Sequence, residues 1–151
     1  MRRSIVLSLV VGTLVLPGAG LSARRAEEAA IRQTVHYYFD GGRNGDSVSL
    51  RKAFHPEARM LFLRDSGLAV VPIGEYIRRV AENKPKAGAV DSTERRIASI
   101  DIAGDAAMAR LELKRPNALI TDYMSLLKVE GRWVIVNKSY SRVPVPAGAS
   151  K

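Results

Sequence analysis

Asp122 is the ionisable residue whose neighbours point most clearly to chemistry. It lies in a β-rich run that ends at Glu130-Gly131, and a second β-rich run follows. That dipeptide predicts a hairpin loop, and strict alternation along the strands puts Asp122 on an apolar face. The apolar members of this face are Met124, Leu126, Trp133 and Ile135. A desolvated carboxylate there suits a general base. A carboxylate at the sheet rim, or one paired with Lys138, Arg142 or a neighbouring arginine, would have a structural role.

The hairpin register makes definite assignments for the second strand. With Val129 opposite Arg132, the predicted pairs are Leu126 with Ile135, Met124 with Asn137 and Asp122 with Ser139. Asn137 then faces inward near Asp122. Lys138 then faces solvent, so Lys138→Ala is expected to change stability by no more than about 0.5 kcal/mol. Trp133→Ala, by contrast, should cost about 3–5 kcal/mol as a core truncation. A bulge within residues 137–139 would instead turn Lys138 inward.

His36 and Tyr38 are the candidate partners of Asp122. His36 lies beside the apolar stripe of a predicted helix, and Asp40 one turn later could orient its imidazole or form a solvent-facing pair with it. We name Asp122, His36 and Tyr38 as catalytic candidates. His55 precedes Pro56 and is expected to form hydrogen bonds within a loop.

Metal and cofactor sites are not expected. The two histidines are not clustered, the chain has no cysteine, and no glycine-rich phosphate loop is present.

Aromatic side chains could line a pocket that stacks a flat ligand, since ligand pockets are mostly apolar with a few polar groups. Core packing explains most of these aromatic residues equally well. The ligand-binding candidates are Tyr38, Phe62, Tyr76, Asp122, Met124, Trp133 and Asn137.

Composition indicates one globular domain of ordinary polarity. The chain has 151 residues, of which 46% are apolar and 26% are charged. Its formal charge of +9 favours anionic partners, although the basic residues are scattered as on a solvated surface. No aromatic residues are interleaved with basic clusters, so we do not expect nucleic-acid binding.

The order of predicted elements indicates an α+β fold with helices on one face of a curved sheet. Residues 1–23 read as a secretory signal, with Arg2-Arg3, a short apolar run and a candidate cleavage site after Ala23. A domain over 24–143 and a flexible tail over 144–151 follow. Helices are predicted over 26–39, from Asp46 to Phe54 and over 73–80, with Gly41-Gly42 ending the first. Strands are predicted over 59–64, 68–71, 93–102 and 107–114, before the hairpin.

Two segments resemble a known superfamily. His36-Tyr-Tyr-Phe-Asp-Gly-Gly-Arg-Asn-Gly-Asp46 and Ala53-Phe-His-Pro-Glu-Ala58 resemble the opening of nuclear transport factor 2-like proteins. The stretches 99–107 and 121–138 are similar to the putative lumazine-binding (SnoaL-like) branch. The resemblance implies a cone: a strongly bent antiparallel sheet wrapped around three helices, with a pocket at its open end. It also implies frequent homodimers.

Three functions remain open at this point. The first is an exported, periplasmic or secreted domain that binds a small aromatic or acidic molecule in the cone, without a cofactor or catalytic machinery. The second is a small isomerase, dehydratase or cyclase with Asp122 as base. The third is an interaction domain that dimerises through the outer face of the sheet, which would carry Tyr123, Leu127, Val134 and Val136. No stable membrane anchor is expected after signal cleavage.

Overall fold

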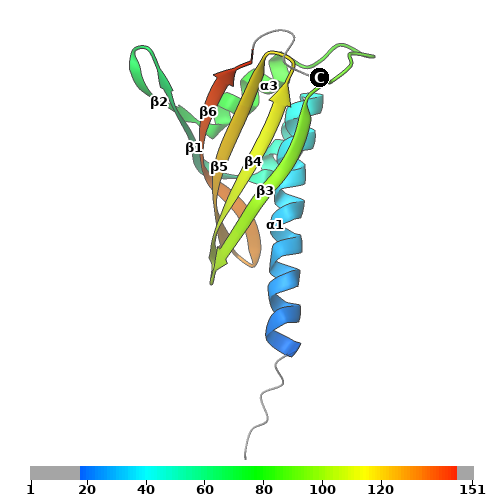
Figure 1. The fold of residues 1–151 in the computed structure, drawn as a ribbon, viewed down its shortest axis with the longest axis vertical. Helices are drawn as coiled ribbons and strands as arrows, with labels where there is room; N and C mark the ends of the chain where they lie inside the picture. The colour runs from blue at the N-terminus through cyan, green and yellow to red at the C-terminus, as the bar shows by residue number, and fades with distance from the viewer. Residues whose placement is uncertain (1–17, 146–151) are drawn as a thin grey trace, which may run out of the picture.

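The computed structural model describes residues 18–145, which form three helices and a six-stranded sheet (Figure 1). The helices are α1 (Gly18–Asn44), α2 (Ser47–Ala53) and α3 (Ile73–Glu82). The strands are β1 (Phe54–Arg64), β2 (Gly67–Pro72), β3 (Glu94–Ala103), β4 (Ala106–Arg115), β5 (Ala118–Val129) and β6 (Arg132–Pro144). The helices lie on one side of the curved sheet, so the predicted α+β cone is confirmed.

The sheet departs from the prediction in one pairing. Its strand order is β2-β1-β6-β5-β4-β3, and all neighbours are antiparallel except β1 and β6, which are parallel. The sheet is therefore mixed, not wholly antiparallel as predicted. The partners Met60 and Lys138 are distant in the sequence, and no turn between them indicates the pairing.

The hairpin of β5 and β6 follows the predicted register only for its first half. Val129 pairs with Arg132 and Leu126 with Ile135, as predicted. The register then shifts, so that Ser125 pairs with Asn137 and the strand carries one extra residue at Val136. A bulge of this kind reverses which side chains face the core beyond it. The predicted partners of Met124 and Asp122 are therefore wrong by one residue.

Lys138 and Asn137 consequently exchange places. Met124 pairs with Lys138, not with Asn137, and Asp122 pairs with Tyr140. Lys138 is buried, with 5% of its surface exposed, whereas Asn137 is half-buried beside Ser125. The predictions that Asn137 faces the pocket and that Lys138 faces solvent are both wrong. Trp133 and Asp122 are buried as predicted.

The core lies between α1 and the concave face of the sheet. The predicted stripe of Ile31, Val35, Tyr38 and Phe39 is buried there. Polar contacts fix the helix to the hairpin loop: Thr34 Oγ1 donates to the Trp133 carbonyl at 2.8 Å, and Trp133 Nε1 donates to Glu27 Oε2 at 2.6 Å. Lys128 Nζ donates to the other oxygen of Glu27 at 2.6 Å. These contacts set the position of α1 along the cone.

The first helix continues past the two glycines predicted to end it. It ends at Asn44, and Gly45 follows with a φ of 65°. Gly41 is needed for packing, because a Cβ there would lie 2.6 Å from Leu50 Cγ on α2. The predicted cap of α2 is confirmed, since Asp46 accepts a hydrogen bond from the Val48 amide at 2.8 Å.

The expected signal segment lies mostly outside the described residues. Residues 18–23 form the first turns of α1, and residues 20–26 are exposed. Most of the expected tail also lies outside, at 146–151. Over residues 18–145, no helix is long and apolar enough to cross a membrane.

Candidate functional site

Three polar side chains form a closed cluster inside the cone: Tyr38 from α1, Asp122 from β5 and Lys138 from β6. Tyr38 Oη donates to Asp122 Oδ2 at 2.7 Å, and Lys138 Nζ donates to Tyr38 Oη at 2.6 Å. Lys138 Nζ also lies 2.9 Å from Asp122 Oδ2. The alternative in which Asp122 pairs with Lys138 is therefore the observed one.

Local sequence explains how the cluster assembles. The apolar stripe of α1 carries Tyr38 into the core, and alternation along β5 brings in Asp122 between Leu111 and Tyr140 on the adjacent strands. Lys138 reaches the cluster only because of the bulge at Val136. The lysine stem packs in the apolar interior, as long cationic side chains commonly do.

Burial dominates the electrostatics of the cluster. It raises the pKa of Tyr38 well above the usual value, and the Asp122 charge adds to this shift. Burial lowers the pKa of Lys138, while the attraction of Asp122 acts in the opposite direction. Lys138 Nζ also lies 4.8 Å from the Tyr38 ring centroid and 5.1 Å from that of Tyr140. The ammonium thus has favourable contacts on three sides.

The cluster leaves one polar atom without a partner. Asp122 Oδ1 is buried and accepts no hydrogen bond from any residue that the structure describes. An unsatisfied buried oxygen is costly, so the fold keeps this carboxylate despite a penalty. Asp122 itself lines none of the cavities described below, and Tyr38 is the cluster member that faces one.

A small inner chamber of about 180 Å³ lies above Tyr38. Its walls combine the aromatic rings of Tyr38, Phe39 and Tyr76 with apolar side chains and two arginines. Burial raises the pKa of Tyr76 to about 12, so its hydroxyl is neutral and can donate a hydrogen bond at physiological pH. The remaining lining residues are Gly42, Val80, Leu113, Arg95 and Arg115.

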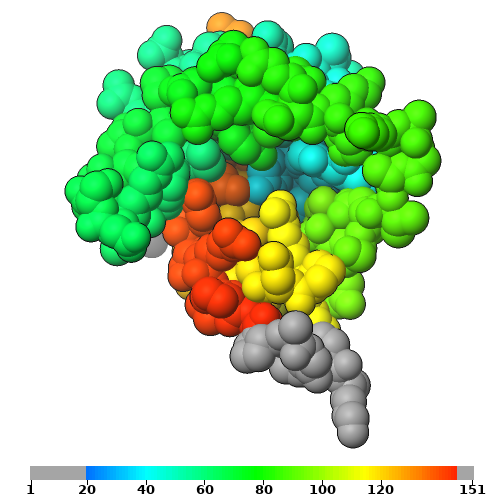
Figure 2. All heavy atoms as spheres, turned by 90° about the horizontal axis from the view of Figure 1, so that it is seen from above, coloured from blue at the N-terminus to red at the C-terminus, as the bar shows by residue number. Residues whose placement is uncertain are grey.

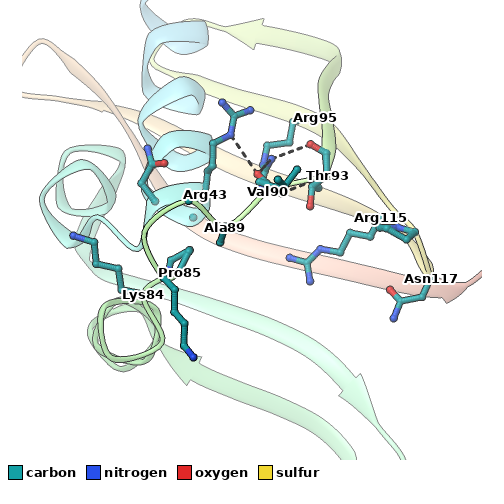
Figure 3. A pocket seen from close by; sticks show the side chains of 15 residues that line it. Arg43, Lys84, Pro85, Ala89, Val90, Thr93, Arg95, Arg115 and Asn117 are labelled. Atoms are coloured by element: carbon teal, nitrogen blue, oxygen red, sulfur yellow. Dashed lines mark hydrogen bonds and ion pairs between the residues drawn. The ribbon is translucent and has the colours of Figure 1, made fainter.

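The inner chamber shares Gly42, Arg95 and Arg115 with a larger cavity of about 910 Å³ at the mouth of the cone (Figure 3). Seen from above, the segment after α3 and the ends of the strands surround a hollow with α1 at its base (Figure 2). Five cationic side chains line the mouth, together with a single carboxylate, Asp91. The cations are Arg43, Lys84, Lys86, Arg95 and Arg115.

Asp91 connects the loop after α3 to two of these arginines. Arg95 Nη1 donates to Asp91 Oδ2 at 2.5 Å, and Arg43 Nε donates to the same oxygen at 3.3 Å. The Thr93 amide donates to Asp91 Oδ1 at 3.0 Å. Partial burial acts to raise the pKa of Asp91, but the hydrogen bonds from Arg95 and Thr93 outweigh it and hold that pKa well below the usual value.

Arg115 differs from the other arginines at the mouth. It stands at the end of β4, its side chain extends into the cavity, and no ion pair links it to any residue within 18–145 (Figure 3). Its charge also acts on the pKa values of Tyr38 and Tyr76. An anion bound to Arg115 would therefore lie close to the tyrosine chamber.

The structure separates the three catalytic candidates. Tyr38 and Asp122 meet, but His36 is exposed on α1 and its ring contacts Phe39 edge-on at a centroid distance of 6.2 Å. The expected meeting of His36 with Asp122 is therefore wrong, because the helical stripe turns His36 outward. His55 forms the expected local bond, as its Nδ1 accepts from the Glu57 amide at 3.2 Å.

The ligand-binding candidates are also dispersed. Tyr38 and Tyr76 line the inner chamber, whereas Met124 is core and Trp133 is buried against α1 near the hairpin loop. Phe62 stacks on Tyr140 at a centroid distance of 4.8 Å. Among the described residues, no group of three or more His, Asp or Glu side chains could hold a metal ion.

Sequence reasoning missed the basic mouth. Arg43, Lys84, Arg95 and Arg115 are far apart from one another in the sequence and read as surface charges. The one available signal was their position in the chain, because Lys84 and Arg115 lie in the loops predicted over 83–90 and 115–117, and binding residues concentrate in loops.

Comparison with known proteins identifies the family of this chain and several similar solved structures. A family described as "Putative lumazine-binding" matches residues 26–141. An NTF2-like protein of unknown function from Shewanella baltica OS155 is 32% identical, with a TM-score of 0.70, covering 80% of this chain and 96% of that one. A similar protein from Methylobacillus flagellatus KT is 28% identical, with a TM-score of 0.68 and coverages of 78% and 93%. One from Silicibacter pomeroyi DSS-3 is 23% identical, with a TM-score of 0.70 and coverages of 80% and 98%. No curated protein matches the chain.

Proposed function

The chain belongs to the "Putative lumazine-binding" family of NTF2-like proteins, and from this premise we propose that it binds a small aromatic anion at the mouth of its cone. The observation that carries the proposal is the continuity of the two cavities. A cation-lined mouth opens into a chamber walled by tyrosines, with Arg95 and Arg115 at the junction. A flat ring would stack in the chamber while its carboxylate or phosphate meets Arg115.

The charges at the mouth favour an anion over a neutral ligand. Five cations and one carboxylate line the cavity, so a bound anion is attracted before it makes any specific contact. The guanidinium of Arg115 offers paired donors that match a carboxylate. The neutral phenol of Tyr76 can donate to a ring carbonyl or nitrogen. Pterin carboxylates, phosphorylated flavin precursors and simple aromatic acids all combine a flat ring with an anionic group.

A thermal-shift screen of the purified protein tests the proposal. Aromatic acids should raise the melting temperature, and the rise should continue with the logarithm of the ligand concentration above the dissociation constant. Uncharged analogues such as benzamide should raise it less than benzoate does. No stabilisation by any aromatic anion at millimolar concentration would contradict the proposal.

Arg115→Ala should weaken binding by about tenfold or more, because a charge-assisted hydrogen bond contributes about 1.5–3 kcal/mol. Arg59→Ala is the matched control, since Arg59 is also exposed and lies outside the two connected cavities. Equal losses in both variants would indicate general charge attraction and not a site.

Catalysis by Asp122 has less support. The carboxylate is fully buried, it is paired with Lys138, and it lines neither cavity. A base must reach the proton that it removes. We therefore place the function in binding, with the buried cluster as a structural support beneath the chamber.

Homodimerisation through the outer face of the sheet is a separate proposal. Met108, Tyr123 and Leu127 are each more than 40% exposed, and Met108 on β4 is the diagonal neighbour of both others on β5. A contiguous exposed apolar patch of this kind marks an interaction surface. Val134, expected on the same patch, is buried, and Val136 is half-buried. Sedimentation analysis of wild type and Leu127→Glu would test it, and a monomeric wild type at micromolar concentration would contradict it.

Export is likewise proposed. Among the residues that cleavage after Ala23 would remove, 20–23 are exposed, and the first fully buried residue over 20–44 is Ile31. N-terminal sequencing of the protein recovered from outside the cytoplasm would test this, with residue 24 expected first.

A further inference from the structure

We infer that Asp91 is an internal anion that occupies the anion subsite formed by Arg43 and Arg95, and that a ligand's carboxylate or phosphate binds there by displacing it. This inference rests on the proposed function and adds Arg43 and Arg95 to Arg115 as the groups that bind the ligand's carboxylate or phosphate. It also makes the loop that carries Asp91 part of the binding event.

The arginine pair has the form of an oxyanion site. Arg43 comes from the end of α1 and Arg95 from the start of β3, and both side chains converge on one oxygen, Asp91 Oδ2 (Figure 3). Two guanidinium groups directed at one oxygen from different elements would hold a carboxylate or phosphate equally well. The subsite lies within the mouth cavity, so a ligand can reach it from solvent.

Arg95 needs an anion in every state of the protein. Only 8% of its side chain is exposed, compared with 50% for Arg43 and 26% for Asp91. A largely buried cation without a counter-charge is costly. In the ligand-free protein Asp91 supplies that charge, and a ligand that removes Asp91 must supply it instead.

Asp91 is the easiest of the three groups to move. It lies between α3 and β3, in a segment without helix or strand, and its second oxygen is held by the Thr93 amide two residues away. None of the other mouth residues of this segment belongs to the hydrophobic core, and Val90 is already 91% exposed. These residues are Lys84, Pro85, Lys86, Gly88, Ala89, Val90 and Thr93. Displacement therefore breaks two ion pairs and one local hydrogen bond, and it exposes no apolar core.

The charge at the mouth favours exchange. With Asp91 in place the lining residues carry five positive charges and one negative charge. One carboxylate cannot neutralise this set, so an added anion finds both Arg115 and the cationic lysines still available. Asp91 thus acts as a competitor that sets the affinity and selects ligands able to replace it.

The test is binding of benzoate, phenyl phosphate and inorganic phosphate to wild type and Asp91→Asn by calorimetry. Asparagine keeps the shape of the side chain but gives up the charge, so both arginines become available. If Asp91 competes, Asp91→Asn should bind each aromatic anion about tenfold more tightly. If Asp91 instead orients the arginines for the ligand, the variant should bind more weakly, and that result would overturn the inference.

Asp101→Asn is the matched control, because it makes the same charge change near the far end of β3 (Figure 1). It should leave the affinities unchanged. A gain equal to that of Asp91→Asn would mean that net charge alone drives binding and would also overturn the inference. If wild type binds the anions and Asp91→Asn binds them no better, displacement is refuted but the proposed function stands. If neither protein binds any of the anions, both displacement and the proposed function are refuted.

A second measurement on wild type avoids any folding defect of the variant. The Thr93 amide is bonded to Asp91 Oδ1 and precedes the first residue of β3, so its protection from hydrogen exchange reports on Asp91. Saturating phenyl phosphate should speed its exchange if Asp91 is displaced. Slower or unchanged exchange would show that the ligand binds with Asp91 in place.

Discussion

Replacing Lys138 with methionine removes one charge from the interior of the cone and keeps most of the side-chain volume. The ammonium is 2.9 Å from Asp122 Oδ2, and the two side chains are 7% and 0% exposed. Breaking a buried ion pair leaves an uncompensated charge and typically costs about 3–5 kcal/mol. Lys138→Met should therefore lower the free energy of unfolding by that amount.

Removing the partners as well should restore stability. Lys138→Met with Asp122→Leu removes both charges but leaves the Tyr38 hydroxyl without its acceptor and its donor. An unsatisfied buried hydroxyl costs about 1–3 kcal/mol, so the double variant should recover only part of the loss. Adding Tyr38→Phe removes the last polar group and should bring the unfolding free energy close to that of wild type.

Urea unfolding followed by fluorescence measures each member of this series, because Trp133 is the only tryptophan and is buried in the core. Lys114→Met is the control, since Lys114 is exposed on β4 and should change stability by no more than about 0.5 kcal/mol. The reasoning would be refuted if Lys138→Met matched that control. It would also be refuted if the triple variant were the least stable of the series.

Three further predictions follow from particular contacts. Gly41→Ala should destabilise the fold, because its Cβ would lie 2.6 Å from Leu50 Cγ. The Cβ of Gly42→Ala would meet only the Tyr76 hydroxyl, at 4.0 Å, so this variant should gain about 0.5–1 kcal/mol of helix stability. Chemical denaturation measures both effects. Hydrogen bonds from Lys128 and Trp133 lower the pKa of Glu27, so its stabilisation is present above pH 4.5 and is lost as the pH falls through the folded-state value. Glu27→Gln should flatten the acid limb of stability measured against pH. The raised pKa of Tyr76, about 12, contributes stability below pH 10 that is lost as the pH rises toward 12, and Tyr76→Phe should remove that component from a tyrosinate absorbance titration.

The sequence predicted the parts of the fold that depend on local periodicity. The stripe from Ile31 to Phe39, the Asp46 cap and the hairpin loop at Glu130-Gly131 all follow from neighbours within a few residues. The parallel pairing of β1 with β6 does not, because no local signal links Met60 to Lys138.

The candidate site was predicted in part. Asp122 and Tyr38 were expected inside the cone, and they meet there. Lys138 was assigned to solvent, and its inward orientation was only an alternative that required a bulge, because Val136 fits a strand on either face and nothing in its type marks the bulge. Arg43, Arg95 and Arg115 were read as ordinary surface charge, since only the folded chain brings the three together.

The bulge at Val136 also affects how relatives can be aligned with this chain. A relative whose last strand lacks the extra residue would direct alternate side chains of that strand into its cone beyond this point. Aligning the two sequences without a gap would then equate a pocket residue in one protein with a surface residue in the other. A lysine in the column of Lys138 would not be an equivalent lysine, and the residue comparable to it in space would stand in the next column. Insertions and deletions within a strand, and not only substitutions, are therefore a route by which this fold can change the chemistry of its interior.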